Sequence, residues 1–193
     1  MEENEIWFPT AEQLEEALKK ERYRKNYGRT LRSTIYSLLV VMAVAVILSV
    51  LLLPVLQISG ESMSPTLEDK DIVVTVNDHA YRTGDVIAFY FNNSILVKRV
   101  IAYAGDWVDI DSDGNVYVNG VQLEEPYLEE KALGECNIGF PYQVPDGKCF
   151  VMGDHRLTSV DSRNSTVGCI SDDAVVGRLL WRVWPLNAFG TVK

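Results

Sequence analysis

The sequence predicts a mainly β protein preceded by one N-terminal transmembrane helix. Three observations lead to this fold class: an uncharged apolar run near the N-terminus, short apolar runs separated by turn residues in the remainder, and no second long apolar segment. The chain has 193 residues, 47% of them hydrophobic, which is enough to bury a core. Its formal net charge of -9 argues against a nucleic-acid partner, because binding phosphates needs an excess of Lys and Arg.

Residues 1–32 are predicted to form a cytoplasmic segment that is mostly helical. Thr10 suits the N-cap of this helix, with Gln13 three residues later to complete a capping box. Glu15 and Glu16 precede Lys19 and Lys20 at the spacing of helical ion pairs. We assign no chemistry to this segment.

Residues 33–56 are predicted to be a transmembrane anchor. No charged residue occurs between Ser33 and Gly60. At about 1.5 Å per residue, the run from Ser33 to Leu53 spans roughly 32 Å, close to the thickness of a bilayer's hydrocarbon core, and Pro54 marks its exit. The run is too long for a cleavable secretory signal, so a lipid bilayer is an expected partner.

Basic residues on the N-terminal flank of this run set the expected orientation. They are Lys19, Lys20, Arg22, Arg24, Lys25, Arg29 and Arg32. Because positive charge stays on the cytoplasmic side, the N-terminus is expected inside the cell and the rest of the chain outside, in a single-pass arrangement.

Beyond the anchor, short apolar runs predict strands at 71–76, 85–91, 95–103, 107–110, 116–118 and 149–153. The hairpin-rich stretch 105–142 is more polar and is predicted to be a small inserted β lobe, which leaves 57–104 and 143–193 for the main β domain. Trp181 and Trp184 could contact the membrane interface, but buried strand aromatics are the preferred interpretation.

The three cysteines and two histidines suggest no reactive thiol and no metal. Cys149 and Cys169 lie beside apolar residues and are expected to be small core side chains, and the one disulfide considered joins Cys136 to Cys149. Two histidines cannot supply a multi-histidine metal site, and no metal-binding motif is present. No metal and no cofactor are therefore expected.

A lysine within an apolar strand is the first candidate for chemistry. Alternation along the strand puts Lys98 on the same face as Leu96 and Val100, where burial would lower its pKa. A neutral lysine can then act as general base towards a serine hydroxyl. The alternative, an edge-strand lysine that extends to water, stays open, and Arg99 is expected to be the solvated member of the pair.

Serines close to the anchor are the second candidate. The run Gly60-Glu61-Ser62-Met63-Ser64 follows soon after Pro54 and would present a hydroxyl near the membrane surface. By itself, such a run is typical of an ordinary polar loop.

Five segments in order carry a resemblance to a known family: GESMSPTL (60–67), TGDVIAF (83–89), VKRVIAYAGD (97–106), MGDHRLTSVDSR (152–163) and WPLN (184–187). Together they resemble the bacterial type I signal peptidases of the Gram-positive type. The resemblance implies a signal-peptidase-type β fold and a serine endopeptidase with a Ser/Lys dyad. Such an enzyme removes signal peptides from preproteins at the cytoplasmic membrane of bacteria, near the secretory translocon.

The resemblance also assigns roles to residues. It makes Ser62 the nucleophile, Lys98 the general base and the Ser62 backbone N–H an oxyanion donor, whereas Gly60 stands where some members carry a serine donor. Ser159 would orient the lysine, and His155 replaces the family's usual asparagine without a catalytic role. The supporting scaffold would comprise Asp154, Arg156, Asp161 and Arg163.

The resemblance further predicts the specificity. Met63, Leu96 and Val97 match positions that line small pockets, which implies cleavage after Ala-x-Ala or similar small-x-small sequences; plain core packing is the alternative for all three.

Other classes share some of these features. Self-cleaving repressor proteases use a similar dyad, but they carry a DNA-binding domain and no membrane span. Signal-peptidase-like factors of pilus or surface-fibre assembly have degenerate dyads, whereas Ser62 and Lys98 are both present here. A peptidase dedicated to one secreted client stays open.

Overall fold

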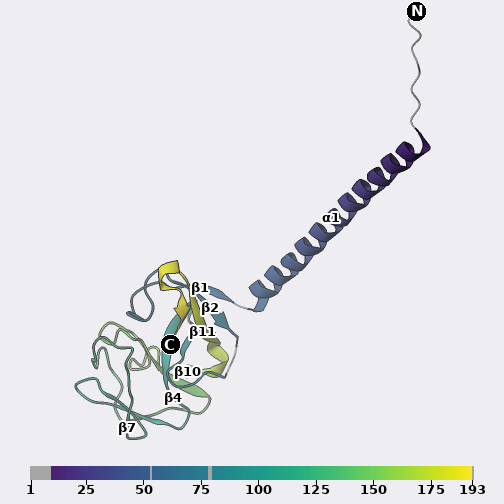
Figure 1. Ribbon diagram of the computed structural model, residues 1–193. Coiled ribbons are helices and arrows are strands. Elements are labelled where there is room, and N and C mark those ends of the chain that lie inside the picture. Colours follow the sequence, from purple (N-terminus) through teal and green to yellow (C-terminus); the bar gives the residue numbers. More distant parts are fainter. Residues whose placement is uncertain (1–9, 53, 78–79, 193) are drawn as a thin grey trace, which may run out of the picture. The chain divides into compact units, whose positions relative to one another are not determined.

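The computed structural model describes residues 10–52, 54–77 and 80–192, with the backbone alone for 48–52. The chain divides into two compact units, with the boundary between Ser49 and Val50. Among the described residues, the first unit holds most of a long helix and the second holds the β-strands (Figure 1).

Helix α1 (Ala11–Leu52) starts where the sequence predicts. The Thr10 N–H donates to Gln13 Oε1 at 3.1 Å, and the Leu14 N–H donates to the Thr10 carbonyl at 3.1 Å. The helix runs without interruption through the expected boundary at residue 32, and apolar side chains such as Leu38 are exposed. Among the described residues, α1 is the one helix long and apolar enough to cross a membrane.

The described part of the second unit contains two antiparallel sheets. The larger has the strand order β1 (Val55–Gln57), β2 (Ile72–Val76), β11 (Val175–Trp184), β3 (Val86–Phe91), β4 (Ser94–Tyr103), β9 (Lys148–Met152), β10 (Ile170–Ser171), with β12 (Gly190–Thr191) also paired to β11. The smaller has the order β7 (Val121–Gln122), β6 (Val116–Val118), β5 (Trp107–Ile110), β8 (Tyr142–Gln143). Two short 3-10 helices, Asp172–Ala174 and Leu186–Ala188, flank β11.

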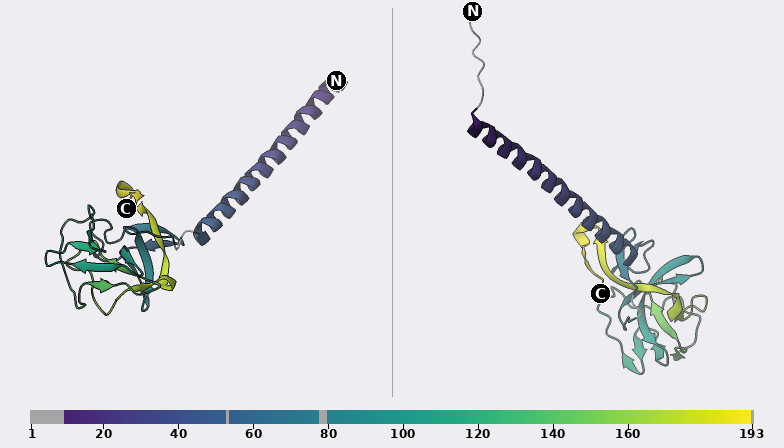
Figure 2. Two further views of the ribbon diagram at one scale, coloured as in Figure 1. Left: turned by 90° about the horizontal axis from the view of Figure 1, so that it is seen from below. Right: turned by 90° about the vertical axis from the view of Figure 1, so that its right-hand side faces the viewer.

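All six predicted strands are present, and the fold class is confirmed as mainly β. The sequence prediction missed β11, the long bent strand in yellow-green (Figure 2). Its pairing with β2 shifts register between Leu179 and Trp181 and again between Arg182 and Trp184, so its sequence lacks a clean alternation. Trp181 and Trp184 are 47% and 51% exposed, which makes the expectation of buried aromatics wrong.

The two sheets share part of one core. Ile101 and Phe150 from the larger sheet pack in one cluster with Val108 of β5 and with Val144. The division of this unit into a main domain and an inserted lobe at 105 and 142 stays a prediction.

None of the three cysteines forms a disulfide, so the pairing of Cys136 with Cys149 is absent. Cys149 is fully buried in the core of the larger sheet, and burial raises the pKa of its thiol to about 12. It is therefore a core side chain, as expected.

Candidate active site

Strand β4 brings Lys98 to the predicted serine. Lys98 pairs with Ile87 of β3 and is only 3% exposed. A hydrogen bond of 2.6 Å joins its Nζ to Ser62 Oγ. The structure thus brings together two residues that lie 36 positions apart in the sequence.

Burial is the main influence on the charge of Lys98. It lowers the pKa of the amine below its ordinary value, and the positive charge of Arg163 acts in the same direction. Asp161 and Asp154 act in the opposite direction, but more weakly than burial. Lys98 forms no ion pair with any described residue, so no direct counterion offsets the effect of burial on its pKa.

The loop between β1 and β2 holds Ser62 in place. Met63 and Leu67 are buried in a core cluster with Val73, which fixes the loop on both sides of residue 64. Gly60 has a φ of +93°, a conformation that a residue with a side chain rarely adopts, and its N–H donates to Asp69 Oδ1 at 3.0 Å. Within the described chain no acceptor takes the Ser62 N–H, so this donor can serve a substrate.

Gly153 lies in direct contact with the nucleophile loop, and the sequence analysis did not single it out. A Cβ at this position would lie 2.2 Å from Ser159 Oγ and 2.4 Å from the Ser62 carbonyl oxygen. The same carbonyl accepts a hydrogen bond of 3.2 Å from the His155 N–H. Lack of a side chain at 153 therefore lets the segment after β9 pack directly against the nucleophile loop.

Ser159 lies beside the site, but the expected hydrogen bond to Lys98 is not formed. Its hydroxyl is fully buried and has no hydrogen-bond partner among the described residues. The amine of Lys98 instead bonds Ser62.

The predicted pair of Asp161 and Arg163 is present and buried. Arg163 Nε and Nη2 donate to the two carboxylate oxygens at 2.9 and 2.8 Å, and the Gly153 N–H donates to Asp161 Oδ2 at 2.9 Å. Arg163 Nη1 also donates to the Leu133 carbonyl at 2.6 Å. This pair therefore joins the segment after β9 to the stretch that precedes β8.

Arg99 is not solvated, contrary to the sequence expectation. It is 1% exposed, and its Nε and Nη2 donate to the carboxylate of Asp154 at 2.8 and 2.6 Å. The guanidinium also lies over the ring of Tyr127, 3.8 Å from the centroid. The prediction failed because both faces of β4 are covered at this point, and not only the face of Lys98.

Arg156 pairs with a residue that the sequence analysis missed. Its Nη2 donates to Glu125 Oε1, and its Nε donates to the Gly153 carbonyl at 3.1 Å. Glu125 is 7% exposed, whereas its neighbour Glu124 is exposed. No local pattern distinguishes these two carboxylates, so only the tertiary structure could identify the buried one.

A groove with mainly aliphatic side chains beside the dyad, called the apolar groove below, adjoins Ser62 and Lys98. Its cavity of about 120 Å³ is lined by residues 56–60, 62–63 and 95–98. These include the three predicted specificity residues, with Met63 buried and Leu96 and Val97 half-buried. The predicted pocket residues and the predicted dyad thus line the same groove.

Comparisons with known proteins show which family this chain resembles. The family described as signal peptidase, peptidase S26, matches residues 31–184. Signal peptidase IB of Staphylococcus aureus (strain N315) is 39% identical over 154 residues, which cover 68% of this chain and 78% of that protein. Signal peptidase I U of Bacillus subtilis (strain 168) is 38% identical over 161 residues, which cover 75% of this chain and 83% of that protein.

A solved structure is also similar. The crystal structure of a signal peptidase I from Enterococcus faecalis V583 covers 51% of this chain and 96% of that chain, with 30% identity and a TM-score of 0.42.

Proposed function

The chain belongs to the signal peptidase family, peptidase S26, and we propose that it cleaves signal peptides from preproteins with Ser62 as nucleophile and Lys98 as general base. Family membership makes it a serine endopeptidase that acts on preproteins carrying signal peptides. The observation that carries the proposed dyad is the 2.6 Å contact between Lys98 Nζ and Ser62 Oγ at a buried lysine.

The proposed reaction uses the neutral amine. Lys98 takes the hydroxyl proton as Ser62 Oγ attacks the scissile carbonyl, and returns it to the leaving amine of the mature protein. The Ser62 N–H donates to the oxyanion. The same amine then activates the water that hydrolyses the acyl-enzyme.

Neighbouring residues have positioning roles in this proposal. Ser159 orients the amine of Lys98 when substrate occupies the site, since its buried hydroxyl packs against Gly153 and has no partner within the described chain. The Asp161–Arg163 and Asp154–Arg99 pairs hold the segment after β9 in place, and Arg156 adds the Glu125 contact.

The small volume of the groove supports specificity for small side chains. Steric overlap excludes large residues from a hollow lined by Met63, Leu96 and Val97. We therefore propose cleavage after Ala-x-Ala and similar sequences.

The apolar half of α1 is proposed to anchor the enzyme in the cytoplasmic membrane, with the N-terminus in the cytoplasm. Signal peptides emerge from the translocon tethered by their own apolar segments. A shared bilayer therefore reduces the entropy that enzyme and substrate lose on meeting.

Cleavage of a preprotein with an Ala-x-Ala site by the full-length, detergent-solubilised protein tests the proposal. Ser62→Ala should abolish cleavage, while Ser112→Ala, at an exposed turn serine, should leave it unchanged. A Ser62→Ala variant that still cuts at the same site would refute the nucleophile. A wild type that cuts only one of several preproteins would favour a peptidase dedicated to one client.

A further inference from the structure

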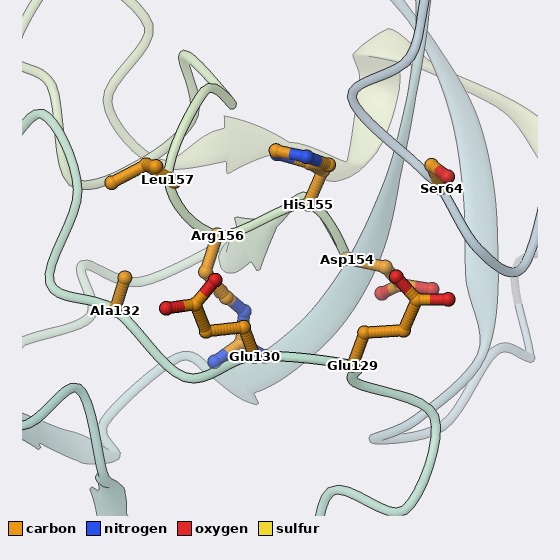
Figure 3. A pocket seen from close by; sticks show the side chains of 8 residues that line it. All are labelled: Ser64, Glu129, Glu130, Ala132, Asp154, His155, Arg156 and Leu157. Atoms are coloured by element: carbon orange, nitrogen blue, oxygen red, sulfur yellow. The ribbon is translucent and has the colours of Figure 1, made fainter.

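A second cavity of about 310 Å³, lined mostly by polar and charged side chains and called the polar cavity below, lies next to the nucleophile loop (Figure 3). Ser64 borders it from the loop, His155 and Leu157 from the segment after β9, and Glu129, Glu130 and Ala132 from the stretch before β8. Figure 3 shows the two glutamate side chains on the wall across from His155. This cavity shares no lining residue with the apolar groove.

The glutamate wall of the cavity is held firmly against the active-site segment. Arg163 Nη1 donates to the Leu133 carbonyl at 2.6 Å, and Arg156 binds Glu125. At Gly134, a Cβ would lie 2.3 Å from the Arg156 carbonyl oxygen, so the two backbones are in direct contact. The buried pairs described above therefore also build this second cavity.

The cavity lies where it can receive the residues that follow the scissile bond of the substrate. Ser62 and Met63 line the apolar groove, and Ser64 lines the polar cavity, so one short run of the loop contributes to both hollows. The His155 N–H binds the Ser62 carbonyl, which brings the cavity wall to the nucleophile. In an uncleaved preprotein whose scissile carbonyl lies at Ser62 Oγ and whose signal-peptide end occupies the groove, the residues after the scissile bond run away from the groove.

The charges on the cavity wall do not cancel. Asp154 and Arg156 also border the cavity, but each is paired, with Arg99 and Glu125 respectively. No ion pair or hydrogen bond joins the carboxylate of Glu129 or of Glu130 to another described residue, and both residues are exposed. The cavity therefore presents two uncompensated negative charges.

We propose that this cavity binds the first residues of the mature protein, after the cleavage site, and that Glu129 and Glu130 favour basic and disfavour acidic side chains there. The inference rests on the proposed function and deepens it. It adds a charge preference beyond the cut to the size preference before it.

Three peptides that are identical up to the Ala-x-Ala site test the proposal. The second and third residues after the cut are both Lys, both Gln or both Asp, and kcat/KM is measured with the full-length protein in detergent at low salt. We expect kcat/KM to fall about three- to tenfold from the Lys to the Asp peptide, since exposed charge pairs contribute modestly. In Glu129→Gln/Glu130→Gln the difference should shrink to less than about twofold.

The matched control is Glu124→Gln/Glu135→Gln, which removes the same charge from exposed positions that do not line the cavity. It should keep the wild-type preference. Equal cleavage of the three peptides by wild type, or an unchanged preference in Glu129→Gln/Glu130→Gln, would overturn the cavity assignment and leave the dyad untouched. No cleavage of any peptide would refute the proposed function itself, and the cavity assignment with it.

Discussion

Lys98 and Arg99 are neighbours on β4 and are almost equally buried, yet their surroundings differ. Arg99 faces the carboxylate of Asp154 and makes two hydrogen bonds to it. Lys98 faces the hydroxyl of Ser62, and burial lowers its pKa. A guanidinium keeps its charge and needs a counterion, whereas an amine can lose its proton. Burial therefore produces a structural ion pair on one face of the strand and a potential base on the other.

Replacing Lys98 should have the largest effect on activity. We expect Lys98→Met to lower kcat at least about 10³-fold, because no other described group is placed to take the Ser62 proton. Lys148→Met, at an exposed lysine, is the control and should cut normally. More than a tenth of wild-type kcat in Lys98→Met would exclude the proposed base.

Replacing Arg99 should act mainly on stability. Arg99→Met leaves Asp154 buried without its counterion, which should lower the free energy of unfolding by about 3–5 kcal/mol. Urea denaturation of the detergent-solubilised protein, followed by tryptophan fluorescence, measures this change. Arg82→Met, at an exposed arginine, should be neutral, and Arg99→Met/Asp154→Leu should recover part of the loss. If Arg99→Met alone is as stable as wild type, the Arg99–Asp154 pair does not contribute to the stability of the fold.

The pH profile should report the lowered pKa of Lys98. Below that pKa the amine is protonated and cannot accept the hydroxyl proton, so kcat/KM should rise about tenfold per pH unit and level off below the ordinary lysine value of 10.5. A peptide substrate without titratable side chains ensures that the pH dependence comes from the enzyme and not from the substrate. A rise that continues up to pH 10.5 would mean that the amine is not perturbed.

The smallest expected effect is on the stability of Lys98→Met. In neutral solution the unfolded chain holds a proton on Lys98 that the folded chain disfavours, so the lysine destabilises the fold there. Lys98→Met should melt a few degrees above wild type at pH 7, and the difference should vanish as pH rises through the ordinary lysine pKa. A difference in Tm that is independent of pH would indicate a packing effect alone.

The sequence predicted the elements and residues that depend on local patterns. Lys98 follows from alternation along one strand, and the six predicted strands have regular apolar runs. Strand β11 was missed because Gly177, Arg178 and Arg182 interrupt its apolar pattern and two register shifts disturb its alternation.

The parts that escaped prediction depend on long-range packing. Burial of Arg99 requires a second covering layer, and that layer includes Tyr127 from an irregular segment. Glu125 and Glu124 look alike in sequence, and only the position of Arg156 decides which is buried. The dyad itself was inferred from a resemblance, since nothing local relates Ser62 to a lysine on another strand.

Gly153 has a consequence for how this protein can vary. Its backbone conformation would accept any residue, but the space for a side chain is already filled by Ser62 and Ser159. In a library that encodes all twenty amino acids at this position, selection for secretion should therefore return glycine codons alone. Glu129 and Glu130, which line the neighbouring cavity, are exposed, so substitutions there should be tolerated by the fold and can change with the preproteins that the enzyme cleaves.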